Sequence, residues 1–258
     1  MKLFLSVTLL FFSLLLSCTG FAQRALKDSS ISIPYFSFQY QFQMPQRDMA
    51  SRFGNNSSVG FSFLHKTKKR IMFGVDWNYI FGRDIKDSNL FVNIGTSSNA
   101  SGNNLIIDKR GNLATTRLWE RGWHSHFKIG TMFLTLGPNP NSGFVFLVGA
   151  GMLYHKIRIE DIGNNAPQLS KEYRKGYDRL SFGFSTSQFI GYQLFSNNKF
   201  VNLMAGVEFI QGFTKNRRGY LYDQFRPDNE SRLDILNGFK VAVSIPLYRR
   251  TPDSYYFY

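Results

Sequence analysis

Two histidines separated by one residue are the feature of the sequence with the greatest capacity for chemistry. In His124-Ser125-His126, the period-two geometry of a strand places both imidazoles on the same face. Such a pair can bind a metal ion, or act as base and orienting group beside a serine nucleophile. Ser125, however, would point to the opposite face, and no acidic partner can be assigned from the sequence.

Other signals of catalysis are missing from the sequence. It contains four histidines and has no Gly-rich phosphate loop, no His-Glu-x-x-His motif and no nucleophile elbow. Its one cysteine, Cys18, cannot form an intramolecular disulfide. We therefore expect no catalytic residue, no metal and no cofactor.

The histidines lie in one of eight predicted strand segments. In seven of them apolar and polar residues alternate, as expected for strands with two different faces, whereas segment 144–154 is apolar on both faces but contains Gly149 and Gly151. The clearest segment runs from Phe36 to Met44, with aromatic residues and Met44 on one face and Ser37 and glutamines on the other. The eight segments span residues 36–44, 58–63, 71–81, 123–133, 144–154, 180–194, 201–209 and 239–247.

The lengths of the segments and of their connections favour a membrane barrel over a soluble β-sandwich. Most segments cover about ten residues, the length that a tilted membrane strand needs, whereas soluble strands centre on about five or six. Long connections (about 46–57, 83–118, 159–177 and 214–236) alternate with short ones (65–70, 135–143 and 196–199). Outer-membrane barrels alternate short periplasmic turns with long outside loops. The sequence therefore predicts an all-β fold, an eight-stranded antiparallel up-and-down transmembrane β-barrel with long extracellular loops. A soluble sandwich or lipid-binding barrel is the alternative.

The two ends of the chain differ from this central region. The N-terminus has the pattern of a secretory signal: Lys2, an apolar run from Leu3 to Leu16, and small residues before Gln23. We expect residues 1–22 to be a cleaved signal peptide, 23–248 the barrel and 249–258 an aromatic tail. Lipidation of Cys18, or a retained anchor helix, is the alternative at the N-terminus.

The predicted compartment bears on the partners of this basic chain, whose formal net charge is +14. Export makes nucleic acid an unsuitable partner, so anionic lipid headgroups and lipopolysaccharide phosphates are the expected counter-charge. The localisation that we expect is the bacterial outer membrane.

A barrel of eight strands is just wide enough for side chains to fill its interior. The polar residues on the inferred inner face include charges of both signs, which should pair there because an unpaired buried charge is very costly. We predict a polar network in the lumen formed by Gln39, Gln41, Asp76, Asn78, His124, His126, Lys128, Glu208 and Lys240.

The outside loops and the tail are candidates for partner contacts. Tyrosine and arginine are favoured at interfaces, and arginine can grip phosphate in a bidentate way. The loop residues expected to contact a partner or lipopolysaccharide are Tyr173, Arg174, Lys175, Lys215, Arg217, Arg218, Tyr220 and Tyr222. In the tail we expect docking, or recognition by the outer-membrane assembly machinery, through Tyr255, Tyr256, Phe257 and Tyr258. A solvated, lipid-facing rim is the simpler interpretation of the loops.

The sequence resembles the small outer-membrane β-barrels of the Bacteroidota in three features. These are Phe21-Ala22-Gln23, the aromatic strands, and the last strand from Gly238 to Tyr248. Some of those proteins are accessory parts of type IX secretion and gliding machinery. The resemblance implies an outer-membrane location and a partner in a secretion complex, and it carries no functional residues over. We expect a non-enzymatic barrel with a structural or docking role. The trio His124-Ser125-His126 also resembles the His/Ser sites of small outer-membrane lipid A deacylases and acyltransferases. A lipid-modifying enzyme of that kind using His124 or His126, and a narrow passive channel, are the alternatives.

Overall fold

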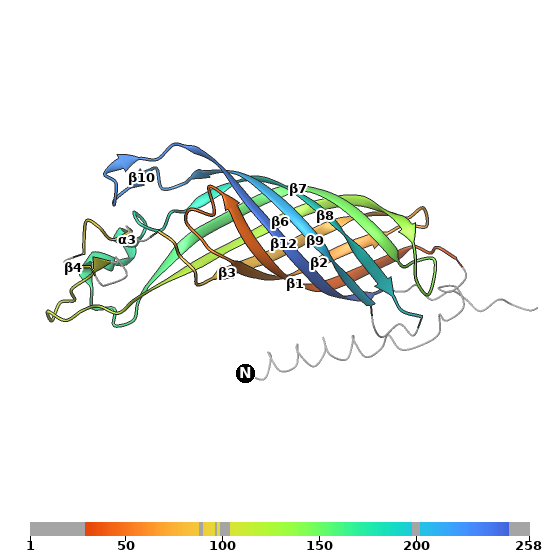
Figure 1. Cartoon of the computed structure of the whole chain (residues 1–258), viewed down its shortest axis with the longest axis horizontal. Coiled ribbons are helices and arrows are strands. Elements are labelled where there is room, and N and C mark those ends of the chain that lie inside the picture. Colours follow the sequence, from red (N-terminus) through yellow and green to blue (C-terminus); the bar gives the residue numbers. More distant parts are fainter. Residues whose placement is uncertain (1–28, 88–89, 96, 99–103, 198–201, 248–258) are drawn as a thin grey trace, which may run out of the picture.

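Eight long strands form a closed barrel in the computed structural model (Figure 1), which describes residues 29–87, 90–95, 97–98, 104–197 and 202–247. These strands are β1 (Ile33–Arg47), β2 (Asn56–Lys66), β3 (Ile71–Gly82), β6 (Thr116–Thr135), β7 (Gly143–Asp161), β8 (Ser181–Phe195), β9 (Asn202–Asn216) and β12 (Ser231–Pro246). Within the described part of the chain, no helix is both long enough and apolar enough to cross a membrane.

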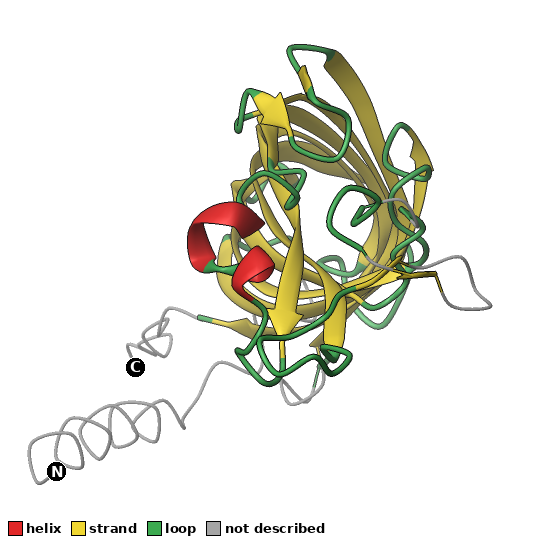
Figure 2. Cartoon of the chain, turned by 90° about the vertical axis from the view of Figure 1, so that its left-hand side faces the viewer, coloured by secondary structure: helices red, strands yellow, loops and turns green. Residues whose placement is uncertain are grey.

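Each strand pairs in antiparallel fashion with its neighbours in the chain, and β1 closes the barrel by pairing with β12 from Tyr35↔Pro246 to Arg47↔Asp234. Viewed from the loop end, the strands form a complete ring (Figure 2). Closure removes sheet edges, so backbone groups in every strand find partners, as a non-polar membrane requires. The predicted fold class, an eight-stranded up-and-down barrel, is confirmed.

The connections alternate in length. Residues 67–70, 136–142 and 196–201 link strands at one end, whereas 48–55, 83–115, 162–180 and 217–230 link them at the other. The long connections contain the short elements β4 (Ser97–Ser98), β5 (Asn104–Leu105), η1 (Pro167–Leu169), α3 (Lys171–Arg174), β10 (Tyr220–Leu221) and β11 (Arg226–Pro227). Within the longest of these connections, β4 and β5 pair through Ser97↔Leu105 and Ser98↔Asn104.

The outer surface of the barrel is apolar and its interior is polar, the reverse of a soluble domain. On β1, Phe38 is 62% exposed and Tyr40 is 44% exposed, whereas Gln39 and Gln41, which alternate with them, are buried. The same inversion holds on the other long strands, where large apolar side chains face outward. This arrangement is stable only if lipid rather than water surrounds the barrel.

The interior is built in three layers. Toward the short turns lies an apolar cluster that includes Tyr35, Met72 and Phe189, and toward the long loops lies a second one that includes Ile80 and Leu153. The polar network lies between them, because inward positions change from apolar to polar and back along β3, β9 and β12. On β3, for example, the inward residues run Met72, Gly74, Asp76, Asn78 and Ile80. Both apolar layers therefore separate the central charges from water.

Candidate functional site

The nine residues predicted for the lumen network are all buried inside the barrel. At its centre, the Lys128 ammonium lies 2.5 Å from Oδ2 of Asp76 and also contacts Glu208. Lys240 lies 3.2 Å from Glu208 and 3.4 Å from Asp76, so two cations and two anions neutralise one another. Gln41 donates to Glu208 over 2.8 Å. Such a cluster is tolerated in a non-polar interior because each charge is paired and hydrogen-bonded.

Strand register decides which of these residues meet. β3 and β6 are aligned so that Asp76 pairs with His126 and Asn78 with His124. Lys128 requires space beside β7, and Gly149 provides it: a Cβ there would lie 3.0 Å from Cγ of Lys128 and 2.5 Å from the Ser187 hydroxyl. Glycine at position 149 thus allows the lysine to cross the lumen.

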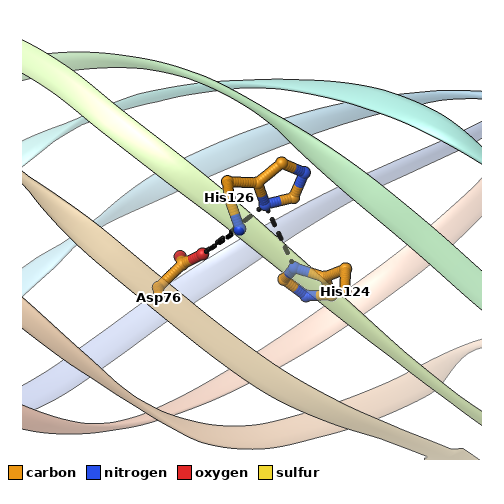
Figure 3. A group of neighbouring side chains, drawn as sticks. All are labelled: Asp76, His124 and His126. Atoms are coloured by element: carbon orange, nitrogen blue, oxygen red, sulfur yellow. Dashed lines mark hydrogen bonds and ion pairs between the residues drawn. The ribbon is translucent and has the colours of Figure 1, made fainter.

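The two histidines share the inner face and meet an acid (Figure 3). Nδ1 of His126 lies 3.5 Å from Oδ1 of Asp76, and its Nε2 lies 2.9 Å from the Ser185 hydroxyl. Ser125, the neighbour in sequence, instead faces outward and donates to the backbone carbonyl of Asp76. The row of carboxylate, imidazole and hydroxyl groups therefore ends at Ser185 of β8, which is itself buried.

A second polar cluster, centred on Asp234, lies nearer the long loops and was not predicted. Its carboxylate accepts from Arg52 at 2.7 Å, His155 at 2.8 Å and Thr214 at 2.5 Å. The prediction missed it because the strands extend past their apolar segments. Continuing the period-two alternation beyond those segments would have placed His155, Thr214 and Asp234 on the inner face.

An aromatic row and a basic row follow one another on the outer surface toward the long loops. Strand register joins Tyr79, Trp123, Tyr154 and Phe182 side by side, with Trp123 stacked on Tyr154 at 5.9 Å. Aromatic rows of this kind mark the boundary between lipid and water. Outward basic residues lie beside this row or beyond it: Arg83, Arg121 and Lys156 continue β3, β6 and β7, whereas Lys215 of the neighbouring β9 pairs with Phe182 and Arg217 follows β9. We call these five residues the basic ring; the prediction included only Lys215 and Arg217.

Three of the predicted loop residues, Tyr173, Tyr220 and Tyr222, line one pocket of about 530 Å³ formed by three long loops. We call it the tyrosine pocket; its lining is Asn93, Ile94, Pro167, Gln168, Tyr173, Tyr177, Tyr220, Tyr222 and Phe225. Its aromatic walls are unusually accessible, with Tyr173 58% and Phe225 72% exposed. Phe225 also has a φ of 49°, a conformation that costs free energy for a bulky residue and is enriched at binding sites.

Buried contacts beneath the tyrosine pocket hold its three loops together. Arg179 pairs with Asp223 at 2.7 Å and with Asp87 at 3.0 Å, so one side chain joins all three loops. Asn93 donates to the backbone carbonyls of Tyr222 and Asp223 at 2.7 Å. Burial, and then the nearby Asp223 carboxylate, raise the pKa of the Tyr177 phenol above its ordinary value. The pocket is therefore preformed, and Tyr177 keeps its proton at neutral pH.

The other predicted loop residues have different positions. Arg174 bonds to the backbone carbonyls of Leu169 and Ile159, and Arg218 pairs with Asp178 at 2.5 Å, so both stabilise the loops. Lys175 is exposed and pairs with Glu172. The predicted signal peptide and the tail residues Tyr255, Tyr256, Phe257 and Tyr258 lie outside the described residues.

These features define the class of the protein. A closed eight-stranded barrel with an apolar outer surface, an aromatic row, a polar interior and alternating short turns and long loops is a membrane-spanning β-barrel. Bacterial barrels of this kind reside in the outer membrane, and the protein is accordingly a small β-barrel of the bacterial outer membrane.

Comparisons with known proteins name no family for the chain. No family model matches the sequence, and no curated protein matches it. Among solved structures, Neisserial surface protein A (NspA) is similar with 11% identity and a TM-score of 0.40, covering 82% of this chain and 96% of that one. Ail, the attachment invasion locus protein of Yersinia pestis, is similar with 9% identity and a TM-score of 0.40, covering 83% and 99%. A complex of Ail with the heparin analogue sucrose octasulfate gives a TM-score of 0.37. Similarity at this level says nothing about function.

Proposed function

We propose that the protein is a non-enzymatic barrel that presents a preformed docking site for another protein at the outer surface of the cell. The observation that carries this proposal is the tyrosine pocket, in which three long loops converge on an exposed aromatic surface. Its volume of about 530 Å³ falls within the range of roughly 300–1,000 Å³ typical of ligand sites. Exposed aromatic surface held in a fixed shape is an unusual feature that marks interaction sites.

The chemistry of the pocket suits a protein partner. Tyrosine combines a large flat surface with a hydroxyl and loses little side-chain entropy on binding, which explains its enrichment at interfaces. The ion pairs of Arg179 fix the loops before the partner arrives, so less ordering entropy is lost in the complex. The sequence resembles small outer-membrane barrels of the Bacteroidota, some of which serve in secretion machinery. In a secretion or surface-assembly complex of that kind, this pocket would receive an apolar or aromatic side chain of a neighbouring subunit.

The pocket can be tested in the native host by placing a photo-crosslinking amino acid at position 225. We expect one discrete adduct, because Phe225 lies at the accessible rim of the pocket. Replacing Tyr173 and Tyr220 by alanine should abolish that adduct, since truncating an aromatic anchor costs about 2 kcal/mol or more, roughly 30-fold in affinity.

The matched control is the same crosslinker at position 113. Leu113 is 59% exposed and belongs to an outer loop but does not line the pocket. An equal adduct from both positions, or an adduct that persists in the double alanine variant, would contradict docking at the pocket. All variants must reach the outer membrane and show the gel shift of a folded barrel on heating.

The basic ring supports a second part of this proposal, contact with lipopolysaccharide phosphates. Arg121 and Lys156 are paired by register, immediately beyond the aromatic row formed by Trp123 and Tyr154. Because aromatic rows of membrane proteins lie at the headgroup level, this position suits contact with outer-leaflet phosphates. The guanidinium of Arg121 lies 5.0 Å from the Trp119 ring, which holds it against the barrel wall.

Reversing both charges, Arg121→Glu with Lys156→Glu, should weaken lipopolysaccharide binding by the purified barrel at least tenfold. The reason is that each basic residue near an anionic surface contributes about 1 kcal/mol. Titration with lipopolysaccharide in detergent measures the change. Lys68→Glu with Lys69→Glu is the control, because it makes the same change of charge in the turn at the opposite end. Equal loss in both variants would show that only net charge matters.

The interior supports a role without catalysis or conduction. Ser185 and His126 contact one another but are 0% and 1% exposed, between two apolar layers, where a lipid substrate would not reach them. The same layers and the central ion pairs fill the cross-section through which ions would have to pass.

A further inference from the structure

Three side chains inside the barrel bring possible metal ligands together (Figure 3). Nδ1 of His124 lies 3.4 Å from Nδ1 of His126, which lies 3.5 Å from Oδ1 of Asp76. One ligand atom from each of the three residues lies within 4.8 Å of the other two. Two atoms bound to one tetrahedral ion, with bonds of about 2.0–2.1 Å, are about 3.3 Å apart. From this agreement we infer that Asp76, His124 and His126 form a binding site for a divalent transition-metal cation such as Zn²⁺.

The surroundings of the ligands match those of a metal site. Metal-binding histidines usually use their second ring nitrogen to hydrogen-bond an orienting group, and Nε2 of His126 lies 2.9 Å from the Ser185 hydroxyl. The backbone amide of His126 donates to Oδ1 of Asp76 at 3.0 Å and so holds the carboxylate toward the imidazole. Among the described residues, Nε2 of His124 is buried without a hydrogen-bond partner. His124 therefore lacks the orienting hydrogen bond that His126 makes, and an ion at its Nδ1 would hold the ring instead.

The two lysines limit the affinity of this site. Oδ2 of Asp76 already faces Lys128 at 2.5 Å and Lys240 at 3.4 Å, whereas Oδ1 faces the histidines. Because the four charges of the cluster cancel, a divalent cation adds positive charge to an interior sealed from water. Removing the more distant ammonium, Lys240, should therefore tighten metal binding, a response that a purely structural histidine pair would not give.

The test uses the tag-free full chain, stripped of metal in denaturant and refolded into detergent with Zn²⁺ or Co²⁺, so that the ion can enter before the barrel closes. We expect one ion per folded chain after desalting, and the visible absorption of tetrahedral Co²⁺. His124→Gln and His126→Gln should weaken binding by more than the 10–100-fold that a change in an orienting group costs, and Ser185→Ala should weaken it by about tenfold. Lys240→Met should strengthen binding.

His155→Gln is the matched control, because His155 is another fully buried histidine of the lumen but bonds to Asp234. It should keep the bound ion. A folded parent chain that refolds with no ion overturns the inference, whatever the variants do. So does equal binding by the folded His126→Gln and His155→Gln variants, which would indicate adventitious ions. If His126→Gln fails to fold, His124→Gln is compared with His155→Gln in its place, because the His124 ring has fewer hydrogen-bonding contacts to lose.

Discussion

Replacing Lys128 by methionine should destabilise the folded barrel by about 3–5 kcal/mol, the usual cost of breaking a buried ion pair by removing one partner. The Lys128 ammonium contacts both Asp76 and Glu208, more closely than Lys240 does, and its side chain is 2% exposed. Without it, two buried carboxylates share the single ammonium of Lys240. The free energy of unfolding, measured in urea with the barrel in lipid vesicles, reports the loss.

A second substitution separates charge balance from packing. In Lys128→Met combined with Glu208→Gln, Asp76 and Lys240 remain as one neutral pair at 3.4 Å, so most of the lost stability should return. Lys215→Met is the matched control, because Lys215 faces outward and its replacement should change stability by no more than about 0.5 kcal/mol. A loss below about 1 kcal/mol for Lys128→Met, or no recovery in the double variant, would contradict a tightly coupled charge cluster.

Introducing arginine at Phe38 should have the next largest effect, a loss of about 2–4 kcal/mol in a bilayer, as found for charged residues on the lipid face near the midplane. Phe38 is 62% exposed and pairs with Phe61 and Val243, which are 50% and 53% exposed. Its whole neighbourhood therefore contacts hydrocarbon. Unfolding in vesicles, compared between parent and variant, measures the cost.

The outcome of Phe38→Arg distinguishes the membrane barrel from a water-soluble one. In water, an exposed phenylalanine can be replaced with a change of about 0.5 kcal/mol or less. Phe225→Arg provides that reference within the same protein, because Phe225 is 72% exposed in an outer loop and its variant should unfold like the parent. Equal, small effects at the two positions would mean that lipid does not surround the strands.

The sequence by itself determined the fold class. Alternation along Phe36 to Met44 and six further segments assigned the two faces of those strands, because successive side chains in a strand must point to opposite sides. The alternation of long and short connections then distinguished the lipid-facing barrel from a sandwich. For the same reason, the sequence sorted Asp76, His126, Lys128 and Glu208 onto the inner face.

Only the tertiary structure decided which inward residues meet. Alternation tells on which face a residue lies but not how far along the barrel axis, since that depends on the register between strands and on barrel closure. The acid beside His126 therefore proved to be Asp76 of β3, and its hydroxyl partner Ser185 of β8 rather than the adjacent Ser125. The tyrosine pocket has the same origin: Tyr173 and Tyr220 meet because the barrel brings two distant loops to one rim.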